Sequence, residues 1–501
     1  MRRETGFIKQ NIREEREIFL NITKWFIYAS IMGVLVGVAD ALFLNLLHKS
    51  SDFSESYKYY FLMLPAVLLI TSFISTKTYS RHKDYSTNSV ISTLNNNKGI
   101  SVLSSIKAFF LPIFTIAAGG SAGKEAPCAD VGAGIGSFLA KLFNLSDNDK
   151  RKLMICGVSA GFAGVFGVPI SGAIFGLEAL FVGKVFYDVM LPALISGIVA
   201  YGVTSHLGVE YIYHPFNFTP VFTQAFFVKV VIAGLFFGVV SLFLIETVRF
   251  LQVLFRYISI KTNWAVRSLI AGVLLVLIGL VFSPNYLGLG MGQIDSMLSG
   301  HDAPALGFVV KTIATALTFA GGGVGGIITP IFFIGANAGI FFAKVFGLDF
   351  TTFAAIGVVS VLAGACNTPL AASIMATELF GPKIAPYAAV ACVISFLITG
   401  KRSIFPAQKF SFKKDLGSDA LDDTVIDLPK RKNLFSILTK HLVPDFRDKN
   451  AKLPSSVDQQ EKLKEETLDK VEEVKEVKPK KATKKSTKKE NKKKDDEPKL
   501  F

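Results

Sequence analysis

The amino-acid sequence predicts an all-α polytopic membrane protein with about 17 or 18 helical segments arranged as two related halves. Half of the 501 residues are hydrophobic, and the mean hydropathy is +0.45. The longest apolar runs, 18–47 and 225–254, exceed the roughly 20 residues that cross a hydrocarbon core. Many other runs are shorter and are interrupted by Gly or Pro, a pattern typical of half-helices that end inside a transporter. Together with the internal repeat described below, these observations exclude an ordinary soluble enzyme.

The first segment, residues 1–17, mixes Arg and Glu. We expect it to form a short amphipathic helix on the cytoplasmic membrane surface. It contains no short apolar core followed by a small-residue cleavage site, so no cleaved signal peptide is expected. A membrane domain then extends over 18–410, with repeat halves at about 58–210 and 223–400.

The two halves are related by long-range similarity. At an offset of 200, seven of the 22 residues in 157–178 recur in 357–378, including the proline and the final glutamate of each segment. Upstream, Gly-Gly-Ser-Ala-Gly-Lys-Glu-Ala-Pro at 119–127 aligns with Gly-Gly-Val-Gly-Gly-Ile-Ile-Thr-Pro at 322–330. Glycine-interrupted segments at matching positions of two halves indicate a substrate site where the repeats meet.

These paired glycine loops suit an anion. Each loop leads into an apolar helix, whose first N–H groups are unpaired and carry about half a positive charge. Such partial charges hold an ion weakly enough for it to leave again. Glu125 lies at the first turn of one of these helices. It is either a helix-start acid favoured by the dipole or a carboxylate that competes with the permeant anion.

The last segment, 411–501, is predicted to be a largely disordered, Lys-rich cytoplasmic tail. Lys478–Lys494 has ten Lys and one Glu and almost no apolar residues, so it cannot bury enough surface to fold. The formal net charge of the chain is +15. Beside a membrane domain, this charge favours attraction to anionic lipid, and we expect no nucleic-acid partner.

The remaining residue types argue against a metal site and against catalysis. The four cysteines lie apart in apolar stretches without a Cys-x-x-Cys pair, and no His-Glu-x-x-His is present. We therefore expect no metal and no cofactor. Two rival functions stay open at this point: a secondary transporter of another small anion, and an intramembrane enzyme.

At these motifs the sequence resembles the CLC family of chloride channels and chloride/proton antiporters, prokaryotic type without regulatory C-terminal domains. Gly123–Pro127 is similar to the family's Gly-Lys/Arg-Glu-Gly-Pro, and Gly326–Pro330 to its Gly-Ile-Phe-x-Pro. The segment from Gly400 to Phe405 is similar to the one that ends at the family's pore tyrosine. The resemblance covers about 20–405 and implies inverted repeats, chloride as substrate, and a homodimer with one pathway per subunit.

The resemblance also implies residue roles. Glu125 would be the gate, ionised when it blocks an outer anion site and protonated when it swings away. The implied anion-binding positions are Tyr85, Ser86, Gly123, Lys124, Gly326, Ile327, Ile328 and Phe405.

The sequence departs from the family pattern at several of these positions. Ala126 replaces a glycine, Phe405 lacks the tyrosine hydroxyl, and Ala179 stands where many antiporters carry a proton-accepting glutamate. We therefore expect a voltage- or pH-gated chloride channel with little proton coupling, with a chloride/proton antiporter as the alternative. Asp130 and Glu178 are candidate proton relays, and for Glu178 and Glu378 we favour helix capping or helix–helix hydrogen bonds.

The expected location is the bilayer of the cell's inner (plasma) membrane. Basic residues flank the first span and fill the tail, so both termini are expected in the cytoplasm.

Overall fold

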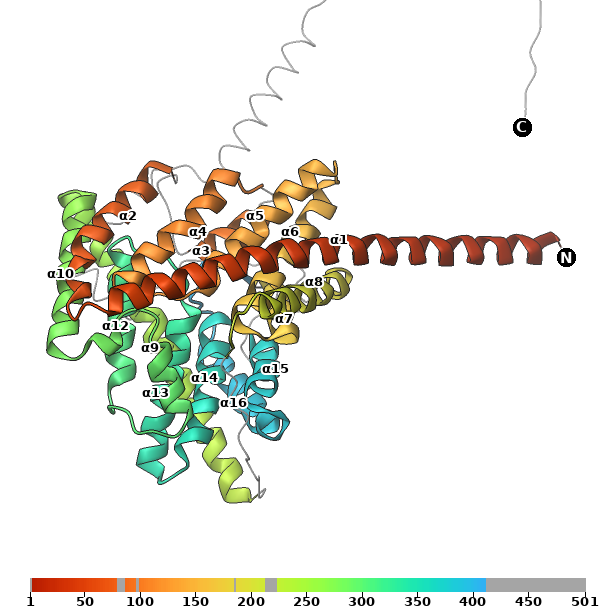
Figure 1. Cartoon of the computed structure of the whole chain (residues 1–501). Helices are drawn as coiled ribbons and strands as arrows, with labels where there is room; N and C mark the ends of the chain where they lie inside the picture. The colour runs from red at the N-terminus through yellow and green to blue at the C-terminus, as the bar shows by residue number, and fades with distance from the viewer. Residues whose placement is uncertain (1, 79–85, 96–98, 184–185, 212–222, 411–501) are drawn as a thin grey trace, which may run out of the picture. The chain divides into compact units, whose positions relative to one another are not determined.

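A computed structural model of the chain describes residues 2–78, 86–95, 99–183, 186–211 and 223–410 (Figure 1). These residues form sixteen α-helices, three 3₁₀ helices and one two-stranded sheet. The elements are α1 (Arg2–Glu55), η1 (Tyr60–Met63), α2 (Leu64–Thr78), α3 (Ser86–Asn95), α4 (Val102–Ala117), α5 (Glu125–Leu142), α6 (Asp147–Phe166), α7 (Pro169–Glu178), β1 (Phe181–Val182), α8 (Tyr187–His206), α9 (Gln224–Lys261), α10 (Trp264–Val281), η2 (Pro284–Tyr286), α11 (Met291–Leu298), α12 (Gly307–Ala320), α13 (Ile328–Phe346), α14 (Phe350–Cys366), α15 (Pro369–Phe380), η3 (Pro382–Ile384), α16 (Ala385–Ile398) and β2 (Lys409–Phe410).

The predicted fold class is confirmed: the molecule is an all-α polytopic membrane protein. In the part of the chain that the structure describes, five helices are long and apolar enough to cross a membrane: α1, α8, α9, α10 and α13. Many of the others are shorter apolar helices of 10–17 residues, as the Gly and Pro interruptions predicted. The predicted tail, 411–501, lies outside the described residues.

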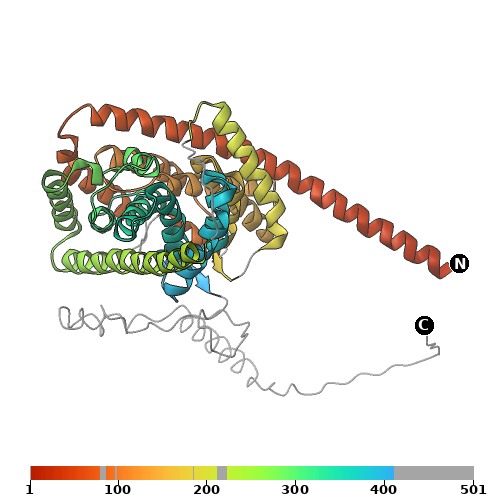
Figure 2. The same cartoon turned by 90° about the horizontal axis from the view of Figure 1, so that it is seen from below.

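Helix α1 differs from the sequence-based expectation. The charged segment 1–17 was expected to form a separate short helix, but a single helix of 54 residues runs from Arg2 through the first span. Its first turns extend away from the other helices in both views (Figures 1 and 2). The physical reason is that 1–17 contains no Pro and only one Gly, so nothing in the sequence ends the helix there.

The two halves are built in the same way. In the first half α5 packs against α6 so closely that a methyl group on Gly132 would collide with the carbonyl of Gly157. In the second half α13 packs against α14, and the equivalent collision joins Gly335 to the carbonyl of Gly357. Small residues at such crossings let two helix backbones approach each other in a membrane protein.

Contacts between the halves are reciprocal. The Thr115 hydroxyl of α4 accepts the Val324 N–H of the second glycine loop at 3.2 Å. Its repeat equivalent, Thr318 of α12, accepts the Ser121 N–H of the first glycine loop at 3.0 Å. Exchange of equivalent contacts is what a two-fold relation between the halves requires.

A second reciprocal pair joins α7 and α15. The two carboxylate oxygens of Glu178 accept the N–H groups of Leu370 and Ala371 at 3.0 and 2.8 Å. The oxygens of Glu378 accept those of Ile170 and Ser171 at 2.9 and 2.8 Å. Each glutamate thus supplies the acceptor that the first turn of the opposite helix lacks, which is the capping arrangement favoured by the sequence.

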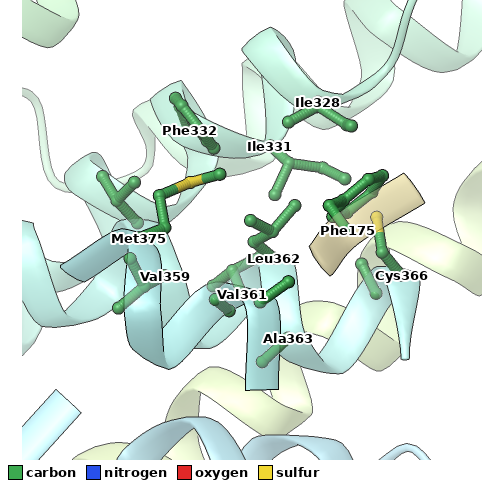
Figure 3. Close-up of a cluster of buried hydrophobic side chains, with 14 of the residues drawn as sticks. Phe175, Ile328, Ile331, Phe332, Val359, Val361, Leu362, Ala363, Cys366 and Met375 are labelled. Carbon is green, nitrogen blue, oxygen red and sulfur yellow. The ribbon is translucent and has the colours of Figure 1, made fainter. Parts of the chain in front are cut away.

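A continuous apolar core lies between the halves. Figure 3 shows Ile328, Ile331 and Phe332 of α13 above Leu362 and Val361 of α14, with Phe175 of α7 beside Leu362. All six side chains are buried, and the core thereby fixes the start of α13 in place. The parallel strands β1 and β2 then join the end of α7 to the last described residues, with Phe181 opposite Lys409.

Candidate functional site

The two glycine loops meet backbone to backbone. The Gly123 N–H donates to the Gly326 carbonyl at 2.6 Å, and the Gly326 N–H donates back to the Gly123 carbonyl at 2.7 Å. Gly123 and Gly326 are equivalent positions in the repeat, so this short antiparallel bridge joins the two halves at matching places. It brings the starts of α5 and α13 together inside the protein.

Glu125 spans this junction. Its side chain is fully buried. The residue is the first of α5, and its carboxylate binds the start of α13. The Ile328 N–H donates to Oε1 at 2.5 Å, and the Thr329 N–H and hydroxyl donate to Oε2 at 3.4 and 2.9 Å. A carboxylate therefore occupies the place where free amides and the helix dipole would otherwise hold an anion.

The glycines of both loops are required by this close approach. A Cβ on Gly123 or on Gly326 would collide with the Glu125 carboxyl group. Neither glycine has a positive φ, so it is the side-chain space and not the backbone conformation that demands glycine. The carboxylate thus lies between two glycines that have no side chain, and it can reach the α13 amides only because these side chains are absent.

The predicted anion-binding residues of the second loop lie at this junction. Ile327 is the residue before α13, Ile328 is the first residue of the helix, and both side chains are buried. The Ile328 amide is the one that contacts Glu125. Lys124 precedes α5, is only partly buried, and makes no capping hydrogen bond with its side chain.

The other predicted anion-binding residues lie at the start of α3 and in the segment after α16. Tyr85 lies outside the described residues, and Ser86 begins α3. Two residues later, the Asn88 side chain accepts the Ala407 N–H at 2.7 Å, which joins α3 to the segment that carries Phe405. Phe405 is fully buried. This contact places the first turn of α3 next to the Phe405 segment, and the anion-binding roles of Ser86 and Phe405 stay predictions.

Gln408 fixes the position of this segment. Its side-chain amide donates to the carbonyls of Ala179 and Cys366, each at 2.8 Å. The end of α7, the end of α14 and the Phe405 segment are therefore held at one place. Ala179 contributes only its backbone to this contact and is 3% exposed.

A polar cavity lies beside α5 at Asp130. It has a volume of about 270 Å³ and is lined by residues of α3, α4 and α5 and by the segment 99–101 that precedes α4. Its polar lining consists of Ser89, Thr93, Ser101, Ser104, Ser105 and Asp130. Asp130, a candidate relay, lies in this lining, five residues after Glu125 on the same helix.

Thr329 is a site residue that the sequence analysis did not single out. Its hydroxyl is the one side-chain donor to Glu125 among the described residues. The signal was available, because a hydroxyl residue stands in the first turn of the second loop's helix. Within the described ranges, no group of three or more His, Cys, Asp or Glu could hold a metal ion.

Comparisons with known proteins identify the family of the chain. Residues 67–400 match the family model described as voltage gated chloride channel. The chloride/fluoride channel protein of Pseudomonas syringae pv. tomato is 31% identical over 409 residues, which cover 80% of this chain and 90% of that protein. An uncharacterized protein of Methanocaldococcus jannaschii is 27% identical, over 78% of this chain and 97% of that protein.

Solved structures show the same fold. A CLC-type fluoride/proton antiporter superposes with a TM-score of 0.73 at 28% identity, over 78% of this chain and 99% of that chain. A slow cyanobacterial Cl⁻/H⁺ antiporter superposes with a TM-score of 0.67 over 75% of this chain and 94% of that chain, and its 16% identity speaks for the fold alone. The chain therefore belongs to the voltage-gated chloride channel family, whose members carry chloride across membranes without a cofactor and are not enzymes.

Proposed function

We propose that the chain conducts chloride through one pathway per subunit, and that the pathway opens when the Glu125 carboxyl group leaves the start of α13. The observation that carries this proposal is the binding of a buried carboxylate by the Ile328 and Thr329 amides. A chloride ion and a carboxylate oxygen need the same donors, so they compete for one place. Protonation removes the negative charge of Glu125 and so releases the helix start to the anion.

The test is chloride efflux from liposomes that contain the purified protein, measured as a function of pH. We expect efflux to rise on acidification, and we expect Glu125→Gln to abolish this rise, because the amide cannot ionise. A pH dependence that persists in Glu125→Gln would reduce Glu125 to a helix-start acid.

A second candidate is exchange of a halide, including fluoride, for protons. Two relatives that match this chain over most of their length carry fluoride in their names. The cavity beside Asp130 supports a proton route, because five hydroxyl side chains and a carboxyl group line it. The departures at Ala179 and Phe405 favour the channel, since neither side chain can bind a proton or donate one to the anion.

The reversal potential under combined chloride and proton gradients separates the two candidates. A channel without coupling reverses at the chloride potential, whatever the proton gradient. An exchanger moves protons uphill when a chloride or fluoride gradient is imposed on the liposomes. Repeating both measurements with fluoride identifies the preferred halide.

For the assembly, we propose a homodimer in the plasma membrane with both termini in the cytoplasm. The dimer follows from the family resemblance, and the orientation from the basic residues at the start of the first span. Light scattering of the detergent-solubilised protein tests the dimer. Labelling of single cysteines placed near each end of α1 tests the orientation.

A further inference from the structure

Asp40 is a buried acid that the gate described above does not use. It lies in α1, within the first membrane span, and is 1% exposed. Among the described residues, no N–H or O–H group donates to either of its carboxylate oxygens, and the Cys128 thiol, a weak donor, is its hydrogen-bonding neighbour. Burying an ionised carboxylate without a partner is strongly unfavourable, so a buried acid of this kind holds a proton or exchanges one.

The packing of α1, α5 and α6 places Asp40 level with the gate. Helices α1 and α6 run in the same direction, because Lys24 pairs with Asp149 at 3.1 Å and Asp40 lies beside Gly164. By the helical rise, Asp40 is about 24 Å beyond Lys24 along α1. Helix α5 runs antiparallel to α6, so that its start, and not its end, faces the Gly164 end of α6. Asp130 lies further along α5, toward the Lys24 side.

The immediate surroundings of Asp40 are small and polar. A Cβ on Gly164 would lie 2.5 Å from Oδ2, so only glycine leaves room for the carboxyl group. Behind Gly164, the hydroxyls of Thr204 and Tyr211 bond each other at 2.5 Å, and Tyr211 donates to the Gly164 carbonyl at 2.6 Å. Proton-carrying hydroxyls therefore lie next to Asp40 on α8 and on the segment that follows it.

Cys128 connects Asp40 with the gate. It lies three residues after Glu125 and four after Lys124, which places all three on one face of the start of α5. Its thiol is within electrostatic reach of Asp40 on one side and of Lys124 and Glu125 on the other. The titratable groups that face Asp40 from the neighbouring elements are thus Cys128, Tyr211 and, through Cys128, the Lys124–Glu125 pair.

We propose that Asp40 is a second proton-binding carboxyl group of the pathway, which loads Glu125 from the membrane side at which α1 ends. The proton leaves an Asp40 oxygen and arrives at an oxygen of the Glu125 carboxylate, whose hydrogen bonds to α13 then break. A proton from the solvent on that side restores the Asp40 carboxyl group, so the step consumes no other reactant. This inference rests on the proposed gating by Glu125, and it holds for a channel and for an exchanger alike.

The test is the rate at which chloride efflux rises after a rapid drop in pH on the side where α1 ends. For Asp40→Asn we expect this rise to be about a hundredfold slower or more, the lower end of the effect of removing a positioned proton-transfer group. The steady efflux at low pH should stay close to that of the wild type, because the anion site is unchanged. Asp40→Glu should restore the rate. Asp52→Asn is the control, since Asp52 lies on the same helix and is exposed, paired with His48 at 3.1 Å.

Infrared difference spectra provide a readout that does not depend on transport. At low pH, Asp40→Asn and Glu125→Gln should each lack one carboxylic acid band that the wild type shows, and the two missing bands should differ in frequency. If Asp40→Asn does not fold, Cys128→Ala replaces it and should slow the rise in efflux in the same way.

The outcomes separate this inference from the proposed function. An unchanged rise in Asp40→Asn, with acid activation intact, overturns the role of Asp40 and leaves gating by Glu125 standing. A wild-type protein that acid does not activate overturns both.

Discussion

The hydroxyl group of Thr329 offers a quantitative test of the gate. Thr329→Val keeps the shape of the side chain and removes the donor that reaches Glu125 Oε2 at 2.9 Å. The two amide contacts, from Ile328 and from Thr329 itself, are left in place. The substitution therefore removes one of three hydrogen bonds that hold the ionised carboxylate at α13.

The size of the effect follows from that single bond. A hydrogen bond to a charged group contributes about 1.5–3 kcal/mol. The bond stabilises only the ionised, closed state, since protonation moves Glu125 away from α13. Its loss makes closing less favourable, so less acid is needed to open the pathway. With about 1.4 kcal/mol for each pH unit, the pH of half-maximal chloride flux should rise by about one to two units.

The assay is chloride efflux from liposomes over a series of pH values, with the wild type and Thr329→Val reconstituted at equal density. Thr312→Val is the matched control. Thr312 is also fully buried, and its hydroxyl donates only within its own helix, to the Phe308 carbonyl at 2.7 Å. A midpoint that stays in place in Thr329→Val, or that moves equally in the control, would refute a gate held closed by these hydrogen bonds.

Three further predictions follow from the fold. Gly326→Ala should displace Glu125 from α13 and leave chloride flux nearly independent of pH, because the new methyl group would overlap the carboxyl group. The control is Gly292→Ala, since no atom lies within 4 Å of a Cβ at that position. Glu178→Gln should lower the free energy of unfolding by about 1–2 kcal/mol through the weakened cap on α15, a loss that a thermal unfolding series would detect. Deletion of the chain after Ser455 should leave dimerisation and chloride flux intact, because the removed sequence is too charged to pack; loss of a folded dimer in size-exclusion chromatography would contradict this.

The sequence predicted the parts of the site that local chemistry defines. The repeat located both glycine loops, and the position of Glu125 at a helix start followed from its motif. The pairing of Glu178 with Glu378 as capping residues followed from their matching places in the two halves. Each of these features depends on residues close together in the sequence or at one fixed offset.

The features that the sequence did not predict arise from packing between distant segments. No local pattern says that Glu125 binds the start of α13 and not its own helix, because that choice depends on how the halves meet. The same holds for Asp40, an acid inside an apolar run whose neighbours come from α5, α6 and α8. The unbroken length of α1 has another cause: the change from charged to apolar residues alters the surroundings of the helix but does not end it, and α1 contains no proline.

The symmetry of the fold and the asymmetry of the site have one origin. Duplication supplies two equivalent helix starts, and the Gly123–Gly326 bridge brings them to one place. At aligned positions, however, the first half carries Glu125 and the second half carries Ile328. One half thus contributes the movable negative charge and the other the fixed donors that receive it. If both halves carried a glutamate, the two carboxylates would repel each other at the junction. If neither half carried one, both helix starts would bind the anion and no group of the protein would displace it. The gate therefore depends on a glutamate in one half only, and the contact between the halves depends on the glycines beside it.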